Sequence, residues 1–195
     1  NIPDSVTKIG VHAFAFCNSI KSINIPGSVT KIGVNAFFGC NSLTSITIPD
    51  SVTEISADAF FGCTSFTSIT IPEGVTEIGL GAFANCTSLT SITIPDSVTE
   101  IDQDAFIGCT SLTSITFPDS VTLIKTGAFY NCTSLTQIIC NNPDLFTVEN
   151  INNRDQIQFI STTDYFKKNY KELLIAIRSS GLNTDSLSNK ELNLL

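Results

Sequence analysis

Apolar residues recur along most of the chain at fixed positions within a unit of 23 residues. In one such unit they are Leu43, Ile46, Ile48, Val52 and Ile55, separated mainly by polar residues. Ile46 and Ile48 alternate with a period of two, which is typical of a half-buried β-strand. The pattern therefore predicts one short strand in each unit.

A proline follows each predicted strand. The prolines that keep the period are Pro3, Pro26, Pro49, Pro72, Pro95 and Pro118. Proline has no N–H to donate to a strand ladder, so each should end its strand and begin the bend that turns the chain back across the coil. The Ala-Phe pairs from Ala13-Phe14 to Ala128-Phe129 keep the same spacing. A fixed period in this range indicates a stacked repeat architecture.

Stacking follows because no single unit can bury its apolar side alone. We expect the strands to lie about 4.8 Å apart in a parallel sheet, so that each column of equivalent residues becomes a ladder through the core. The strand side carries smaller residues than the Ala-Phe side. This difference predicts a curved solenoid with the sheet on its concave face.

The consensus L-x-x-I-x-I-P-x-x-V-x-x-I-x-x-x-A-F-x-x-C, seen in full from Leu43 to Cys63, resembles the BspA-like, or Treponema pallidum-type, subfamily of leucine-rich repeats. The resemblance covers residues 1 to about 140. It implies an α/β repeat solenoid, a right-handed leucine-rich-repeat horseshoe. It also implies a surface or secreted protein with a role in cell adhesion and host-pathogen interaction, so the expected location rests on this resemblance alone.

The repeats divide the chain into two parts. Residues 1–140 should form an array of about six coils of 23 residues, the first incomplete because Asn1-Ile2-Pro3 falls where a strand should already be ending. We therefore expect a fragment of a longer protein. Beyond residue 140 the pattern decays, with Asn141 in the place of the proline. Residues 141–195 are predicted to be a degenerate last coil and a C-terminal helical cap.

A helix is predicted over residues 164–179, with Asp164 as N-cap and Gly181 as its stop. Its apolar side is Phe166, Tyr170, Leu173, Leu174 and Ile177, and its polar side carries Lys167, Lys168 and Lys171. The favoured interpretation is a cap that lays the apolar side over the last coil. The alternative is an amphipathic helix that docks on a partner. The capping-box pattern of Ser188 and Glu191 predicts a further short helix over residues 189–195.

Charge narrows the classes of partner. Ten Lys and Arg against 18 Asp and Glu give a net charge of -8, which repels nucleic acid and anionic membrane surfaces. No apolar run approaches the roughly 20 residues that cross a bilayer, so this segment should not insert into a membrane.

Six cysteines also keep the period, namely Cys17, Cys40, Cys63, Cys86, Cys109 and Cys132. Neighbours one coil apart would lie within the disulfide window of roughly 4.4 to 6.8 Å, so distance alone does not exclude bridges. All six are equivalent and recur beside the Phe column, which favours free, buried thiols. The seventh, Cys140, falls in a strand column and is interpreted in the same way. Without close pairs such as C-x-x-C, zinc is less favoured, and no cofactor is predicted.

Catalysis is not indicated. His12 is the single histidine, which leaves no multi-histidine metal site and no credible triad. Gly39, Gly62 and Gly108 repeat with the period, which marks them as turn residues and not as a phosphate loop. Every unit keeps its length, so the array has no insertion that would carry catalytic groups. An enzyme would need a domain outside this segment.

The outward columns of the predicted strands are serine and threonine, and an acidic column follows the prolines. The candidate ligand-binding residues on this face are Ser45, Thr47, Asp50, Ser68, Thr70, Glu73, Ser91, Thr93, Asp96, Ser114, Thr116 and Asp119. A second acidic column is Glu54, Glu77 and Glu100. Residues 50–119 hold ten acidic residues and no Lys or Arg, and a basic partner or a cation would relieve the repulsion among them.

Interpretations without a ligand stay open for both the hydroxyl columns and the acidic columns. Serine and threonine also serve as soluble strand residues, and an acidic surface also keeps a repetitive protein in solution. Calcium needs six to eight converging oxygens, and one carboxylate per coil does not obviously converge. The leading hypothesis is a non-enzymatic module that binds a protein or glycan. The alternative is a secreted effector or intracellular scaffold that binds a host protein through the repeats and the C-terminal helix.

Overall fold

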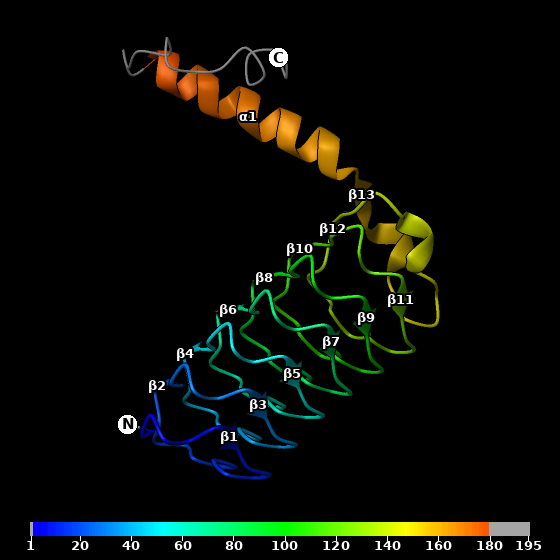
Figure 1. Ribbon diagram of the computed structural model, residues 1–195. Coiled ribbons are helices and arrows are strands. Elements are labelled where there is room, and N and C mark those ends of the chain that lie inside the picture. Colours follow the sequence, from blue (N-terminus) through cyan, green and yellow to red (C-terminus); the bar gives the residue numbers. More distant parts are fainter. Residues whose placement is uncertain (1, 180–195) are drawn as a thin grey trace.

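The computed structural model describes residues 2–179. They form a parallel β-solenoid followed by one helix (Figure 1). Each coil contributes a three-residue strand, and these strands are β2 (Ser22–Asn24), β4 (Ser45–Thr47), β6 (Ser68–Thr70), β8 (Ser91–Thr93), β10 (Ser114–Thr116), β12 (Gln137–Ile139) and β13 (Gln158–Ile160). The strands from β2 to β12 occupy the predicted positions, so the predicted strand of each unit is confirmed, whereas β13 was not predicted. They pair in parallel, β2 with β4 and β6 through β13 in order.

A second sheet runs along another side of the coils. Its two-residue strands are β1 (Lys8–Ile9), β3 (Lys31–Ile32), β5 (Glu54–Ile55), β7 (Glu77–Ile78), β9 (Glu100–Ile101) and β11 (Leu123–Ile124). This sheet is not predictable from the sequence, because two residues are too few to show an alternating pattern. Which sheet lies on a concave side, and the handedness of the coil, stay predictions.

The core is a set of ladders, as expected from the columns. Six Phe rings, from Phe14 to Phe129, stack one above another with ring centroids 5.1 to 5.4 Å apart and planes within 4 to 8° of parallel. The five rings from Phe37 onward are fully buried. Stacked aromatic pairs stabilise a fold beyond the area they bury, so this ladder is a main source of cohesion between coils.

The turn next to each Phe has a left-handed backbone. Gly39 (φ 66°), Gly62 (φ 67°) and Gly108 (φ 71°) occupy this column, which confirms them as turn residues. Asn85 (φ 57°) and Asn131 (φ 59°) fill it in other coils, as expected for residues that tolerate this conformation.

The last coil closes the core itself. It contains the short 3-10 helices η1 (Pro143–Leu145) and η2 (Arg154–Gln156) and ends in β13, which pairs with β12. Phe146, Ile151 and Ile157 are buried in it, and the Phe146 ring lies 5.0 Å from that of Phe117. The end of the apolar core is therefore covered by residues that precede the helix.

Helix α1 (Thr162–Ser179) leaves the array after β13 and points away from it (Figure 1). Phe166 is 61% exposed, so the predicted packing of this residue on the last coil is wrong. The physical reason is that the last coil already covers the core. The side chains of Leu173, Leu174 and Ile177, the stop at Gly181 and the short helix over residues 189–195 lie outside the described residues.

The helix also begins earlier than predicted. Asp164 is not the N-cap, because Ser161 holds that position. The Asp164 N–H donates to Ser161 Oγ at 3.1 Å, and Ser161 Oγ donates to Asp164 Oδ2 at 2.7 Å. Asp164 is thus the third helical residue of a reciprocal cap. No helix among the described residues is long and apolar enough to cross a membrane.

Candidate binding surface

The eight Ser and Thr residues of β4, β6, β8 and β10 form one surface, which we name the strand face. In each strand the central Ile points into the core and its two neighbours point outward. The register pairs serine with serine and threonine with threonine from β6 through β10. The Ser and Thr residues of β4, β6 and β8 are exposed, and Ser114 and Thr116 are half-buried. The structure therefore brings the predicted hydroxyl columns together on one face.

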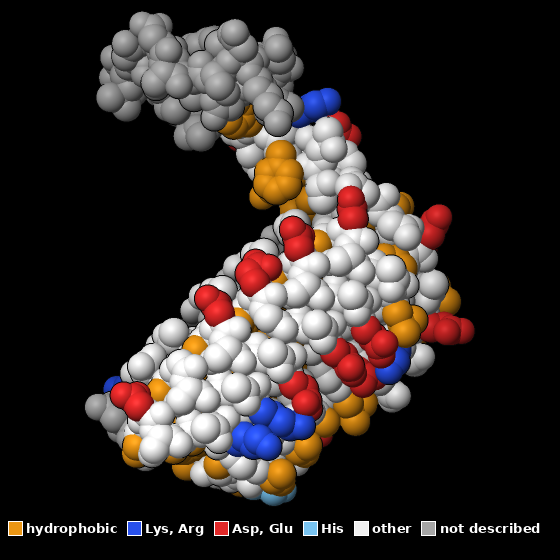
Figure 2. Space-filling model, viewed as in Figure 1, with side chains coloured by type: hydrophobic (Ala, Val, Ile, Leu, Met, Phe, Trp, Pro, Cys, Tyr) orange, Lys and Arg blue, Asp and Glu red, His pale blue; other side chains and the backbone are white. Residues whose placement is uncertain are grey.

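Asp50, Glu73, Asp96 and Asp119, which we name the acidic row, are exposed three residues beyond the strand face. Figure 2 shows a row of acidic side chains along this flank. Ion pairs within residues 2–179 join Lys31 to Glu54 and Lys125 to Glu100 and Asp102, and none involves the acidic row. These carboxylates therefore face solvent without a cation from the described chain.

The second acidic column differs, because lysines neutralise part of it. Lys31 Nζ lies 2.8 Å from Glu54 Oε2, and the hydrogen bond from Lys31 holds the pKa of Glu54 below its usual value. Lys125 Nζ lies 2.5 Å from Glu100 Oε1 and 3.0 Å from Asp102 Oδ1, which raises the pKa of Lys125.

Both partnerships follow from the repeat. Lys31 and Glu54 are one period apart, as are Asp102 and Lys125. These ion pairs were not predicted, although the spacing of the residues in the sequence is a sufficient signal for them.

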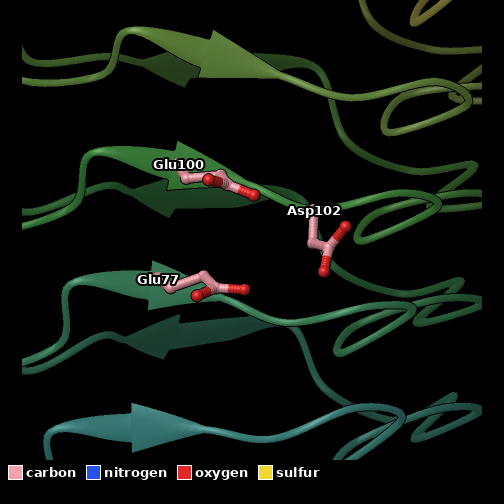
Figure 3. A group of neighbouring side chains, drawn as sticks. All are labelled: Glu77, Glu100 and Asp102. Carbon is pink, nitrogen blue, oxygen red and sulfur yellow. The ribbon is translucent and has the colours of Figure 1, made fainter.

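Two carboxylates of this column, Glu77 and Glu100, converge with a third, that of Asp102, which lies outside the column. One oxygen from each of Glu77, Glu100 and Asp102 lies within 4.8 Å of the others (Figure 3). The ammonium of Lys125 already contacts two of them. The cluster thus binds the ammonium group of Lys125. Its three carboxylates are also too few for calcium, which takes six to eight oxygen ligands.

The cysteine column is buried, and its thiols are unreactive. Cys40, Cys63, Cys86, Cys109 and Cys132 are fully buried, and each Sγ–H donates to the carbonyl oxygen of the Phe of the preceding coil, at 2.9 to 3.3 Å. Burial raises the pKa of the Cys63 and Cys132 thiols to about 12. The predicted burial is confirmed for these five residues, while Cys17 is half-buried. Thiols held neutral in this way are poor nucleophiles.

Asn141 connects the acidic row to α1. Its Nδ2 donates to Asp119 at 2.9 Å and 3.3 Å, and its Oδ1 accepts from the Thr162 N–H at 3.1 Å. The residue stands where each earlier coil has proline. The sequence alone indicates only that the repeat decays at this position.

The geometry defines an array of in-register parallel coils, and the comparisons agree. A family model described as BspA type leucine rich repeat region matches six copies, over residues 1–112 and 53–169. The chain belongs to this family of leucine-rich repeats. Among curated proteins, no sequence matches the chain.

One solved structure supports the fold, and two others are similar in sequence. The chain is 36% identical to a leucine-rich repeat protein of T. pallidum, with a TM-score of 0.67, over 68% of this chain and 62% of that one. It is 27% identical to a leucine-rich repeat protein from Bacteroides ovatus (TM-score 0.49, 83% of this chain, 56% of that one). It is 30% identical to a leucine-rich cell surface protein from Faecalibacterium prausnitzii (TM-score 0.43, 82% and 55%). The chain spans less than two thirds of each of these proteins.

Proposed function

We propose that the chain is a non-enzymatic binding module that holds a protein partner against the strand face and the acidic row. The observation that supports this most is the register, which sets equivalent hydroxyls side by side across β6, β8 and β10. Small hydroxyls let a partner approach the sheet closely and offer it both donors and acceptors. Leucine-rich repeats use such extended surfaces for recognition.

The acidic row specifies the charge of the partner. Its four carboxylates carry no ion pair with the described chain, and their repetition along one flank creates a negative field. A basic protein surface would be attracted to this field, and its approach would depend on salt. A glycan ligand and the exclusion of nucleic acid stay predictions.

The biological setting is inferred from the family resemblance. We place the module in a surface or secreted protein that takes part in adhesion or host interaction. The alternative, a secreted effector or intracellular scaffold, uses the same repeats and adds a contact through α1. The exposed Phe166 on that helix is compatible with such a contact.

The proposal is tested by blocking the strand face. The variant Ser68→Arg with Ser91→Arg puts bulk and positive charge at its centre. Thr76→Arg with Thr99→Arg is the matched control, because these threonines are also exposed but lie outside the strand face. Both variants and the wild type are measured against a panel of matrix proteins, host-cell proteins and glycans. We expect the strand-face variant alone to lose a ligand, and equal loss in both variants would contradict the proposal.

A further inference from the structure

A groove of about 310 Å³ lies between α1 and the ends of two strands of the array. We name it the α1 corner. Its lining includes Ile94, Asp96, Phe117, Pro118 and Asp119 of the array, with Thr162 and Phe166 of the helix. Figure 2 shows a hollow between helix and array, with apolar surface of the helix above the row of acidic side chains. The corner thus combines apolar surface with two carboxylates of the acidic row.

The wall that α1 supplies is fixed by hydrogen bonds. Thr162 and Phe166 are four residues apart and so lie on one side of the helix. The Thr162 N–H is held by Asn141, which also binds Asp119. These hydrogen bonds hold the first turn of the helix against the acidic row. Phe166 then lies over the ends of β8 and β10.

Phe166 is the most unusual part of this wall. Its side chain is 61% exposed, although the residues around it include the buried Ile94 and Phe117. A large exposed aromatic side chain beside a groove is the kind of anchor that interfaces use, because covering it removes apolar surface from water.

The charges decide what kind of segment fits. Asp96 and Asp119 are exposed and belong to the lining, whereas no Lys or Arg among the described side chains does. No ion pair within residues 2–179 involves either carboxylate. An acidic peptide is repelled by this lining, and a purely apolar one leaves both carboxylates without a counter-charge.

We propose that the α1 corner is the anchor site for a basic linear segment of the partner, in which a large apolar side chain stands within two residues of a Lys or Arg. The apolar side chain packs between Phe166 and Pro118, and the basic side chain reaches Asp96 or Asp119. The proposal rests on the proposed function, which it deepens by naming the chemistry of the bound segment. Asn141 has a positioning role in it, since it holds the helix wall.

The test uses a phage-displayed library of random heptapeptides as the probe, selected on the whole chain. Selected peptides are then synthesised and titrated against four variants. Phe166→Ser removes the apolar wall at an exposed position, and Asp96→Asn with Asp119→Asn removes the charges. Tyr165→Ser serves as a control for a neighbouring aromatic residue that does not line the groove, and Glu77→Gln controls for loss of an acidic residue elsewhere.

We expect selected peptides to pair Leu, Ile, Phe or Trp with a nearby Lys or Arg. Phe166→Ser should weaken their binding about tenfold, as should the double Asn variant at low salt, and both controls should bind as the wild type does. The proposal is overturned if no peptide is enriched, if enriched peptides lack the basic residue, or if Phe166→Ser binds them equally well. If a panel ligand is lost by the strand-face variant but not by Phe166→Ser, only the α1 corner is refuted and the proposed function stands.

Discussion

Asn141 Nδ2 donates to the carboxylate of Asp119 at 2.9 Å, across the boundary between two coils. In each earlier coil this column holds proline, which has no side-chain donor. With asparagine in place of proline, the last regular coil gains a polar link to the coil before it. The same side chain accepts a hydrogen bond from the Thr162 N–H, which fixes where α1 begins. A departure from the repeat is therefore the feature that orients the helix.

Replacing Asn141 by Ala should free the start of α1. The variant loses two hydrogen-bonded links, which contribute about 1 kcal/mol each at most because they are exposed. We expect faster hydrogen exchange over residues 162–170, measured by mass spectrometry, with little change in the unfolding of the array. Asn142→Ala is the matched control, since the Asn142 side chain makes no cap hydrogen bond. Identical exchange in the wild type and Asn141→Ala would show that the bridge does not hold the helix.

Removing one ring from the Phe ladder should destabilise the array strongly. Phe83 is fully buried, and its ring lies 5.4 Å from those of Phe60 and Phe106. Phe83→Ala should lower the free energy of unfolding in urea by about 3 to 5 kcal/mol. Phe166→Ser, at an exposed site, should change it by less than about 1 kcal/mol. A small loss for Phe83→Ala would mean that the ladder is not the main contact between coils.

The buried thiols should make the fold sensitive to alkali. Burial raises the pKa of Cys63 and Cys132 to about 12 in the folded protein, against an ordinary value of 9.0. Their neutral form is favoured by folding, so the stability they contribute is complete below pH 9 and is lost as the pH rises from 9 to 12. Within this window each thiol lowers the free energy of unfolding by about 1.4 kcal/mol per pH unit.

The measurement is the free energy of urea unfolding at pH 8, 9 and 10 under reducing conditions. Cys63→Ser with Cys132→Ser keeps a donor for the Phe carbonyls but does not titrate in this range, so its slope should be shallower than that of the wild type. Parallel slopes for the two proteins would contradict the burial of these thiols.

Lys125 should contribute most to the thermal stability of the protein at low salt. Its ammonium contacts Glu100 and Asp102 beside Glu77, so Lys125→Gln leaves three converging carboxylates without a cation. We expect a lower melting temperature at low salt that recovers as NaCl is added, because salt screens their repulsion. Lys31→Gln is the control and should show a weaker effect, since Lys31 forms an ion pair with Glu54 alone. Equal salt dependence in both variants would contradict the claim that Lys125 neutralises a cluster of three carboxylates.

Columns of like residues made most of the fold predictable. Ile46, Pro49, Phe60 and Cys63 recur at one spacing, and stacking turns such recurrence directly into strands and ladders. The second sheet was missed because Glu54 and Ile55 alone carry no alternation. The ion pairs of Lys31 and of Lys125 were missed although the same spacing predicts them.

The C-terminal region was harder for a physical reason. An amphipathic pattern such as that of Phe166 and Tyr170 indicates a helix but does not say what covers its apolar side. That depends on whether the core still needs covering, and Phe146 and Ile157 had already closed it. The hydroxyl and acidic columns lie along one flank, and their role as a binding surface stays a prediction. The link made by Asn141 depends on a single irregular residue.

The central claim is that the acidic row and the strand face bind a basic protein partner. The most direct measurement is the affinity of a panel ligand, at 50 mM and 500 mM NaCl, for the wild type and for the variant with Asp50, Glu73, Asp96 and Asp119 changed to Ser. A variant with Glu77, Asp144, Glu149 and Asp155 changed to Ser removes the same charge elsewhere on the exposed surface. We predict that wild-type affinity falls at high salt, that the acidic-row variant loses the ligand and that the control variant keeps it. Equal binding by the acidic-row variant and the wild type at both salt concentrations would contradict the claim and leave the row with only a solubilising role.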